Sequence, residues 1–211
     1  MKSKNAHNTN VAVRALEKIW GNQIRADYRR GILPNEKTLQ AAIYHYLRRS
    51  RPKVDVFVEI TKFLGQKGNI PDLIITRNHR IEAVVELKFV PNKGIVYQRD
   101  CRKLAKWSRL VGGPSMSKKV DTLELNPKTM NWKDKKIEKN RYTLGSFTAW
   151  VFAAIGTDCD AFDPEKVKEY FLSKKCVVKS PSNFSIFRGI VFSRKRRAPQ
   201  FDHLPLSGRA E

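Results

Sequence analysis

The stretch from Pro71 to Lys88 reads P-D-L-I-I-T-R-N-H-R-I-E-A-V-V-E-L-K. Two runs rich in β-branched residues, 72–76 and 81–90, flank a short polar turn, which is the pattern of a tight antiparallel hairpin. The second run is apolar on both faces, as is typical of a strand at the centre of a sheet. We therefore predict two neighbouring strands here and place the rest of the chain around them.

The register of this hairpin decides whether its two acidic side chains meet. Neighbouring side chains of a strand point to opposite faces, so only some registers place Asp72 and Glu86 on one face. A three-residue loop from Asn78 to Arg80 gives such a register, with Asp72 directly opposite Glu86 and with Lys88 following on the same face. Directly opposed Cβ atoms lie roughly 5 Å apart, so both carboxylates can bind one divalent cation.

Two carboxylates and an ammonium among apolar neighbours are costly to bury unless they pair with one another or with a metal. Carboxylate oxygens suit Mg²⁺, which can hold a phosphodiester and lower the pKa of a bound water. Lys88 is placed to steady the resulting hydroxide or the charge that develops on phosphorus. A Glu-x-Lys sequence alone is most often a solvated charge pair. Here, however, Pro71-Asp72 opens the preceding strand and apolar residues surround Glu86.

These residues resemble the signature of the PD-(D/E)xK nuclease superfamily, whose members have the restriction-endonuclease-like fold. Pro71-Asp72 matches the first half of that signature, and Glu86-Leu87-Lys88 matches the second half. The resemblance implies a site that hydrolyses phosphodiester bonds, in which Asp72 and Glu86 bind Mg²⁺ and Lys88 helps to activate water.

The resemblance also implies roles for two residues on flanking helices. Many members carry a glutamate on the helix before the sheet that reaches the metal, and Glu36, just after the predicted N-cap Asn35, is its counterpart here. An acidic residue at a helix N-terminus is equally explained by the helix dipole. Gln98, ten residues after Lys88, resembles a residue that orients the lysine or the attacking water. It is otherwise an ordinary polar residue at a helix start.

The predicted elements follow one another as helix, strand, hairpin, helix, strand, helix and strand. This order gives a mixed α/β (α+β) fold with helices flanking a central mixed sheet, and it is similar to the αβββαβ core of restriction-endonuclease-like proteins. We divide the chain into an N-terminal basic helix (1–33), a nuclease-like domain (34–193) and a basic tail (194–211) that we expect to be disordered. A basic segment within the domain (112–145) has no convincing period and is predicted to be a functional insertion or a lid.

The composition indicates a polyanionic partner. The 42 basic residues exceed the 20 acidic ones by 22 charges, far more than solubility requires. Nucleic acid fits this charge best, and the charge does not choose between DNA and RNA. No apolar run approaches the length of a membrane span, and the N-terminus lacks an apolar signal region. We therefore expect a cytoplasmic protein that does not bind membranes.

The predicted helix over about 95–110 carries a face of basic residues at helical spacing. We predict that this face contacts phosphates, although a charged helix face can also be simply solvated. The loop before Pro71 adds two lysines beside the proposed site, for which the same two explanations hold. The residues of this prediction are Arg99, Arg102, Lys103, Lys106, Arg109, Lys62 and Lys67.

The sequence thus favours a metal-dependent DNA endonuclease that uses Mg²⁺, or Mn²⁺ in its place. Two alternatives stay open: a non-catalytic nucleic-acid-binding protein of the same fold, and a structure-specific resolvase or transposition-type nuclease. The mode of recognition is open as well. A chain of this size without a separate recognition domain favours shape or backbone recognition, whereas a symmetric homodimer would read a palindrome.

Overall fold

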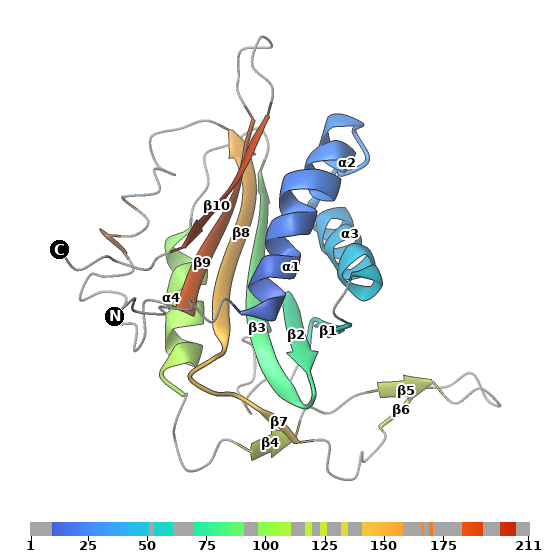
Figure 1. Cartoon of the computed structure of the whole chain (residues 1–211), viewed down its shortest axis with the longest axis vertical. Coiled ribbons are helices and arrows are strands. Elements are labelled where there is room, and N and C mark those ends of the chain that lie inside the picture. Colours follow the sequence, from blue (N-terminus) through green and yellow to red (C-terminus); the bar gives the residue numbers. More distant parts are fainter. Residues whose placement is uncertain are drawn as a thin grey trace, which may run out of the picture.

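The structure is a computed structural model, and it describes residues 10–50, 53–60, 70–90, 97–110, 117–119, 123–125, 132–134, 141–157, 166, 169–170, 183–191 and 199–205. Six strands form the main path of its sheet. In spatial order they are β1 (Asp55–Val58), β2 (Leu73–Arg77), β3 (Arg80–Val90), β8 (Ala149–Thr157), β9 (Phe184–Val191) and β10 (Gln200–Pro205) (Figure 1). The central pairs β3–β8 and β8–β9 are parallel, whereas the outer pairs are antiparallel. The predicted mixed sheet is confirmed.

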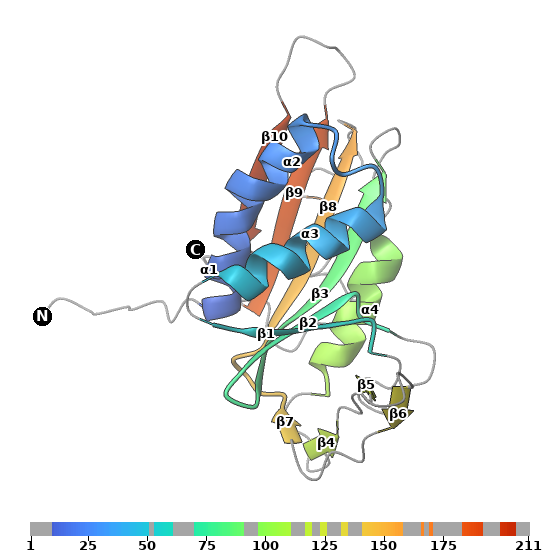
Figure 2. The same cartoon turned by 90° about the vertical axis from the view of Figure 1, so that its right-hand side faces the viewer.

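Helices cover both faces of this sheet. On one face lie α1 (Val11–Ile19), which continues through the π-helical turn η1 (Trp20–Ile24) into α2 (Arg25–Arg29), and α3 (Glu36–Arg49). Figure 2 looks onto this face, where α3 crosses the strands obliquely. The other face is covered by α4 (Gln98–Ser108), so the described chain has three layers (Figure 1). The predicted mixed α/β class with flanking helices is therefore confirmed.

The apolar side chains of β3 divide between the two layers of helices. Ala83 and Val85 join the core under α1 and α3. Val84 joins the second core, where Phe152 of β8 and Leu104 of α4 also lie. Because successive side chains of a strand point to opposite faces, a strand buried on both faces must be apolar at nearly every position. This explains the unbroken apolar run Ala83-Val84-Val85 at the centre of β3.

The turn between β2 and β3 has two residues. Asn78 and His79 have φ angles of 50° and 59°, and Arg77 pairs with Arg80 across the turn. Two successive residues with positive φ are the mark of a type I′ hairpin turn, and Asn tolerates this region better than most residues. The predicted three-residue loop was therefore wrong.

A β-bulge lies three residues beyond the turn on β3. The pairing shifts between Ile75 and Thr76, which leaves Glu82 as an extra residue on β3. Beyond the bulge, Leu73 lies opposite Val85. The shorter turn and the extra residue cancel, so the register at the far end of the hairpin is the one that the sequence predicts.

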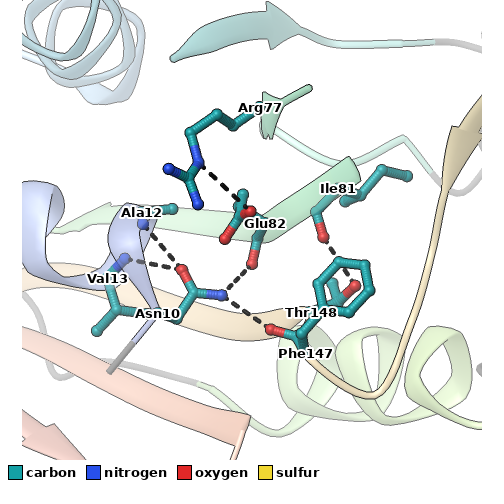
Figure 3. A network of polar contacts seen from close by, with 8 residues as sticks. All are labelled: Asn10, Ala12, Val13, Arg77, Ile81, Glu82, Phe147 and Thr148. Carbon is teal, nitrogen blue, oxygen red and sulfur yellow. Dashed lines mark hydrogen bonds and ion pairs between the residues drawn. The ribbon is translucent and has the colours of Figure 1, made fainter. Parts of the chain in front are cut away.

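One side chain ties the start of α1 to the sheet (Figure 3). The side-chain oxygen of Asn10 accepts hydrogen bonds from the backbone N–H groups of Ala12 and Val13, at 2.8 and 3.3 Å. Its amide group donates to the carbonyl oxygens of Glu82 and Phe147, at 2.7 and 2.9 Å. Asn10 is thus both the N-cap of α1 and a link between α1, β3 and the segment before β8.

The structure describes strands in the predicted insertion and in the tail that was expected to be disordered. Within 112–145 it describes four short strands, and within the expected disordered tail residues 200–205 form β10, which pairs with β9. A disordered tail was the wrong expectation for those six residues, since they complete the edge of the sheet. The four short strands are β4 (Ser117–Lys119), which pairs with β7 (Arg141–Thr143), and β5 (Leu123–Leu125), which pairs with β6 (Trp132–Asp134).

Among the described residues, no helix has the length and apolar character needed to cross a membrane.

Candidate active site

The acidic residues meet where β2 begins beside the second half of β3. Continuing the observed register by one residue places Asp72 opposite Glu86, as the sequence predicts. The Oδ2 atom of Asp72 accepts a hydrogen bond of 2.6 Å from the backbone N–H of Leu87. The Oε2 atom of Glu36, on the first turn of α3, accepts one of 3.2 Å from the N–H of Phe89. Two carboxylates therefore lie against the edge of β3 just beyond the last residue that pairs with β2.

Glu86 is buried and has one oxygen without a partner. Its residue surface is only 2% exposed. Its Oε2 atom accepts a hydrogen bond of 2.7 Å from the ammonium of Lys103, which also donates to the carbonyl oxygen of Ile70 at 2.7 Å. No described group in hydrogen-bonding position meets the other oxygen, Oε1. A buried acceptor without a partner is costly, so this atom marks a place where a ligand would be stabilised.

Burial raises the pKa values of three carboxyls at the site, those of Asp72, Glu86 and Asp100. Burial raises the pKa of Glu86 to about 9, helped by the charge of Asp72 and opposed by the hydrogen bond and charge of Lys103. Burial also raises the pKa of Asp72, against a backbone hydrogen bond and the charge of Lys103. Asp100 of α4 follows the same pattern, opposed chiefly by the charge of Lys88. Such a cluster favours either bound protons or a bound cation.

Lys88 lies on the same face of β3 as Glu86, as the sequence predicts. The intervening residue, Leu87, points into the opposite core under α1 and α3. Lys88 is half-buried, and its charge acts on the half-buried Asp100 of α4. The lysine therefore lies on the α4 side of β3, near enough to Asp100 for their charges to interact.

A glutamine that the sequence analysis did not single out fixes the position of Asp72. Gln40 is buried on α3, one turn after Glu36. Its side-chain amide donates a hydrogen bond of 2.8 Å to the carbonyl oxygen of Asp72. The N–H of Glu59, just after β1, donates to the same oxygen at 3.2 Å. The backbone that carries the Asp72 carboxylate is thus held from two sides.

Gln98 is half-buried at the start of α4. Its backbone carbonyl accepts hydrogen bonds from the side chains of Arg102 and Tyr170. Within the described residues, no hydrogen bond joins the side-chain amide of Gln98 to the carboxylates, so its predicted role stays a prediction. The predicted loop lysines, Lys62 and Lys67, lie outside the described residues.

The basic face of α4 is smaller than predicted. Four of its five residues are exposed and form what we call the basic ridge: Arg99, Arg102, Lys106 and Arg109. Lys103 does not belong to it. Its side chain is only 21% exposed, because it turns towards Glu86.

The sequence analysis therefore missed the roles of three residues in the site: Gln40, Asp100 and Lys103. Gln40 lies inside an otherwise apolar helix stripe, which is itself a signal, since a polar residue on a buried face needs a partner. Asp100 and Lys103 are three residues apart at the border between the apolar and basic faces of α4. The side chain of a residue at such a border can point towards the sheet or towards solvent, so helical spacing alone does not predict its direction.

The donor set fits a magnesium ion in its number and chemistry of ligands. Among the residues that the structure describes, no group of three or more Asp, Glu, His or Cys side chains is arranged to hold a metal. Mg²⁺, however, keeps several waters and is commonly held by one or two carboxylates together with substrate phosphates. Asp72 and Glu86 supply those two carboxylates, and the unpartnered Oε1 atom of Glu86 is an available donor.

Comparison of the chain with models of known protein families, with curated proteins and with solved structures finds no match. Function is therefore inferred from the residues and geometry of the site.

Proposed function

We propose that this chain is a metal-dependent DNA endonuclease of the PD-(D/E)xK type, with a restriction-endonuclease-like core. The observation that carries the proposal is the pair Asp72 and Glu86. These two carboxyls lie opposite each other where β2 begins beside β3. Their pKa values are raised, and one buried oxygen of Glu86 has no partner among the described residues. Structural ion pairs rarely leave such an atom, because it costs stability and brings no compensating contact.

In this proposal, each residue of the chain has a distinct task. Asp72 and Glu86 would hold Mg²⁺, or Mn²⁺ in its place, and Glu36 would support the edge of β3 or complete the ligand set. The bound ion supplies a water of lowered pKa and neutralises charge on the phosphate. Lys88 would hold the attacking water or stabilise the charge that develops on phosphorus. Gln40 keeps the backbone of Asp72 in place.

The basic ridge would bind the nucleic-acid backbone. Its four cations, Arg99, Arg102, Lys106 and Arg109, are exposed on the helix that carries Lys103 into the site. A row of cations at helical spacing matches phosphates and carries no base-specific information. We therefore favour recognition of backbone and shape, and we propose DNA as the substrate with RNA as the direct comparison.

The test is cleavage of plasmid, linear and branched DNA, and of RNA, in Mg²⁺ or Mn²⁺. Glu86→Ala and Lys88→Ala are each expected to reduce cleavage at least about 100-fold while nucleic-acid affinity is retained, since they remove a metal ligand and a transition-state contact. Glu17→Ala, which removes an exposed acid on α1, is the matched control and should cleave at the wild-type rate. Cleavage that survives both site substitutions would contradict the proposal. A preference for branched DNA would favour a resolvase-type nuclease, and dimers in solution would favour a palindromic or paired target.

A second candidate is a non-catalytic nucleic-acid-binding protein of the same fold. The observation in its favour is the contact between Lys103 and Glu86, which gives one oxygen of the buried carboxyl a partner without any metal. Such a protein would bind DNA through the basic ridge with a strong salt dependence. Its wild-type form would cleave none of the substrates in either metal ion.

A further inference from the structure

Helix α4 sends two side chains away from its basic ridge and towards β3. Asp100 and Lys103 lie one turn apart, and both are half-buried, whereas the four ridge residues are exposed. The ammonium of Lys103 is 2.7 Å from Glu86 Oε2 and 2.7 Å from the carbonyl oxygen of Ile70. It therefore bridges the two strands of the hairpin, since Ile70 precedes β2 and Glu86 lies in β3.

The two oxygens that this ammonium contacts are of the kind that Mg²⁺ and Mn²⁺ bind. Carboxylate and backbone carbonyl oxygens are hard donors, and such cations take them in preference to nitrogen or sulfur. Oε2 of Glu86 accepts a hydrogen bond from Lys103, while Oε1 is buried and meets no hydrogen-bond partner within the described part of the chain. A cation between Asp72 and Glu86 would approach this carboxylate and so compete with the ammonium for it.

The surroundings of Lys103 also offer its ammonium a second position. The Nζ atom lies 5.2 Å from the centre of the Trp107 ring, one turn further along α4. An ammonium at this distance is attracted by the ring face. The ammonium is already near this buried ring while it contacts Glu86, and the Lys103 side chain is 21% exposed. A rotation of the flexible lysine side chain would therefore move the charge from Glu86 towards the solvent.

We propose that Lys103 is a positioning residue that holds Glu86 and the Ile70 carbonyl together in the absence of a divalent cation and is displaced when the cation binds. This inference rests on the proposed function, because it assumes a cation between Asp72 and Glu86. We call this replacement of the ammonium by the cation the exchange. Before metal binds, Lys103 keeps Glu86 and the Ile70 carbonyl in place. Metal binding is weakened by the free energy needed to displace the ammonium.

The test measures Mn²⁺ binding by the full-length protein, from the signal of free Mn²⁺ in electron paramagnetic resonance. Lys103→Met is expected to bind Mn²⁺ about 10-fold more tightly than the wild type and, without metal, to unfold at lower urea concentration. If the contact of Lys103 were merely structural, Lys103→Met would lower both the Mn²⁺ affinity and the urea concentration at which the protein unfolds. Arg25→Met, which removes an exposed charge on α2, should change Mn²⁺ affinity by less than about 2-fold. Lys103→Arg, which keeps the charge, should restore weak binding.

A second measurement follows the Lys103 ammonium directly in the wild-type protein, with Lys103→Met used only to assign its resonance. Nitrogen-15 spectra of lysine ammonium groups should contain a resonance for Lys103, protected by its two hydrogen bonds and absent from Lys103→Met. Saturating Mg²⁺ is expected to shift or abolish it. A resonance unchanged in saturating Mg²⁺, or unaltered Mn²⁺ affinity in Lys103→Met, would overturn the exchange while leaving the proposed function standing. Absence of Mn²⁺ binding in the wild type, with Glu86→Ala as reference, would overturn the proposed function and the exchange with it.

Discussion

Replacing Glu86 by Gln should stabilise the protein at alkaline pH when no divalent cation is present. Burial raises the pKa of the Glu86 carboxyl from 4.5 to about 9. The folded state therefore keeps its proton across a range in which the unfolded chain loses it. The stability that this group contributes is fully present below about pH 4.5 and is lost as the pH rises towards 9. Gln cannot ionise, so the variant escapes this loss.

The size of the effect follows from the two pKa values of Glu86. Each pH unit between them costs the wild type about 1.4 kcal/mol. At pH 8, about 3.5 units above the lower value, the ceiling is about 5 kcal/mol, and at pH 5 it is less than about 1 kcal/mol. A gain of at least about 2 kcal/mol at pH 8 is therefore expected for Glu86→Gln, which is a large share of the stability of an ordinary domain.

The assay is urea unfolding at pH 5 and pH 8, with EDTA present, for the wild type and Glu86→Gln. Glu82→Gln is the control, since Glu82 is also buried on β3 but pairs with Arg77. That variant should be less stable than the wild type, because it loses an ion pair. The reasoning about Glu86 is refuted if Glu86→Gln loses stability relative to the wild type between pH 5 and pH 8. That outcome would mean that Lys103 holds the carboxylate ionised.

Three further outcomes test other parts of the structure. Asn10→Ala should lower the free energy of unfolding by about 2 kcal/mol, because it removes the N-cap of α1 and the two hydrogen bonds to the carbonyl oxygens of Glu82 and Phe147. A loss of less than about 0.5 kcal/mol in urea unfolding would contradict this. Gln40→Leu should weaken Mn²⁺ binding roughly 10-fold, because it removes the hydrogen bond that holds the backbone of Asp72, a proposed metal ligand; unchanged binding by calorimetry would exclude that role. Arg102→Gln should reduce the salt dependence of DNA binding by about one phosphate contact; Arg25→Gln, an exposed change on α2, should leave the slope unaltered, and equal slopes for both would argue against the ridge.

The sequence predicted the hairpin because its signal is local. The run from Ile81 to Val90 is apolar on both faces, which only a strand at the centre of a layered sheet can satisfy. The helix start at Asn35 was equally local, and its capping hydrogen bond is present. The turn at Asn78 and His79 was missed because neither residue is Gly, the usual sign of a two-residue turn. The bulge at Glu82 has no sequence signal of its own.

The candidate site was predicted only where it depends on strand geometry. Alternation along β3 places Glu86 and Lys88 on one face whatever the rest of the chain does. The direction of Lys103 depends on the height of α4 above the sheet, which no pattern within the helix reveals. Helical spacing therefore assigned Lys103 to the basic ridge, and the structure turns it inward.

The arrangement of the acids follows from where β2 stops. β2 pairs with β3 only as far as Val85, yet β3 continues beside β8 to Val90. On the open edge, the N–H groups of Leu87 and Phe89 still need acceptors, because a buried amide without one is costly. Carboxylates from Asp72 and Glu36 supply them. The N–H groups left unpaired where β2 ends thus bring two carboxylates to one place. A cation or a lysine must then balance their charge.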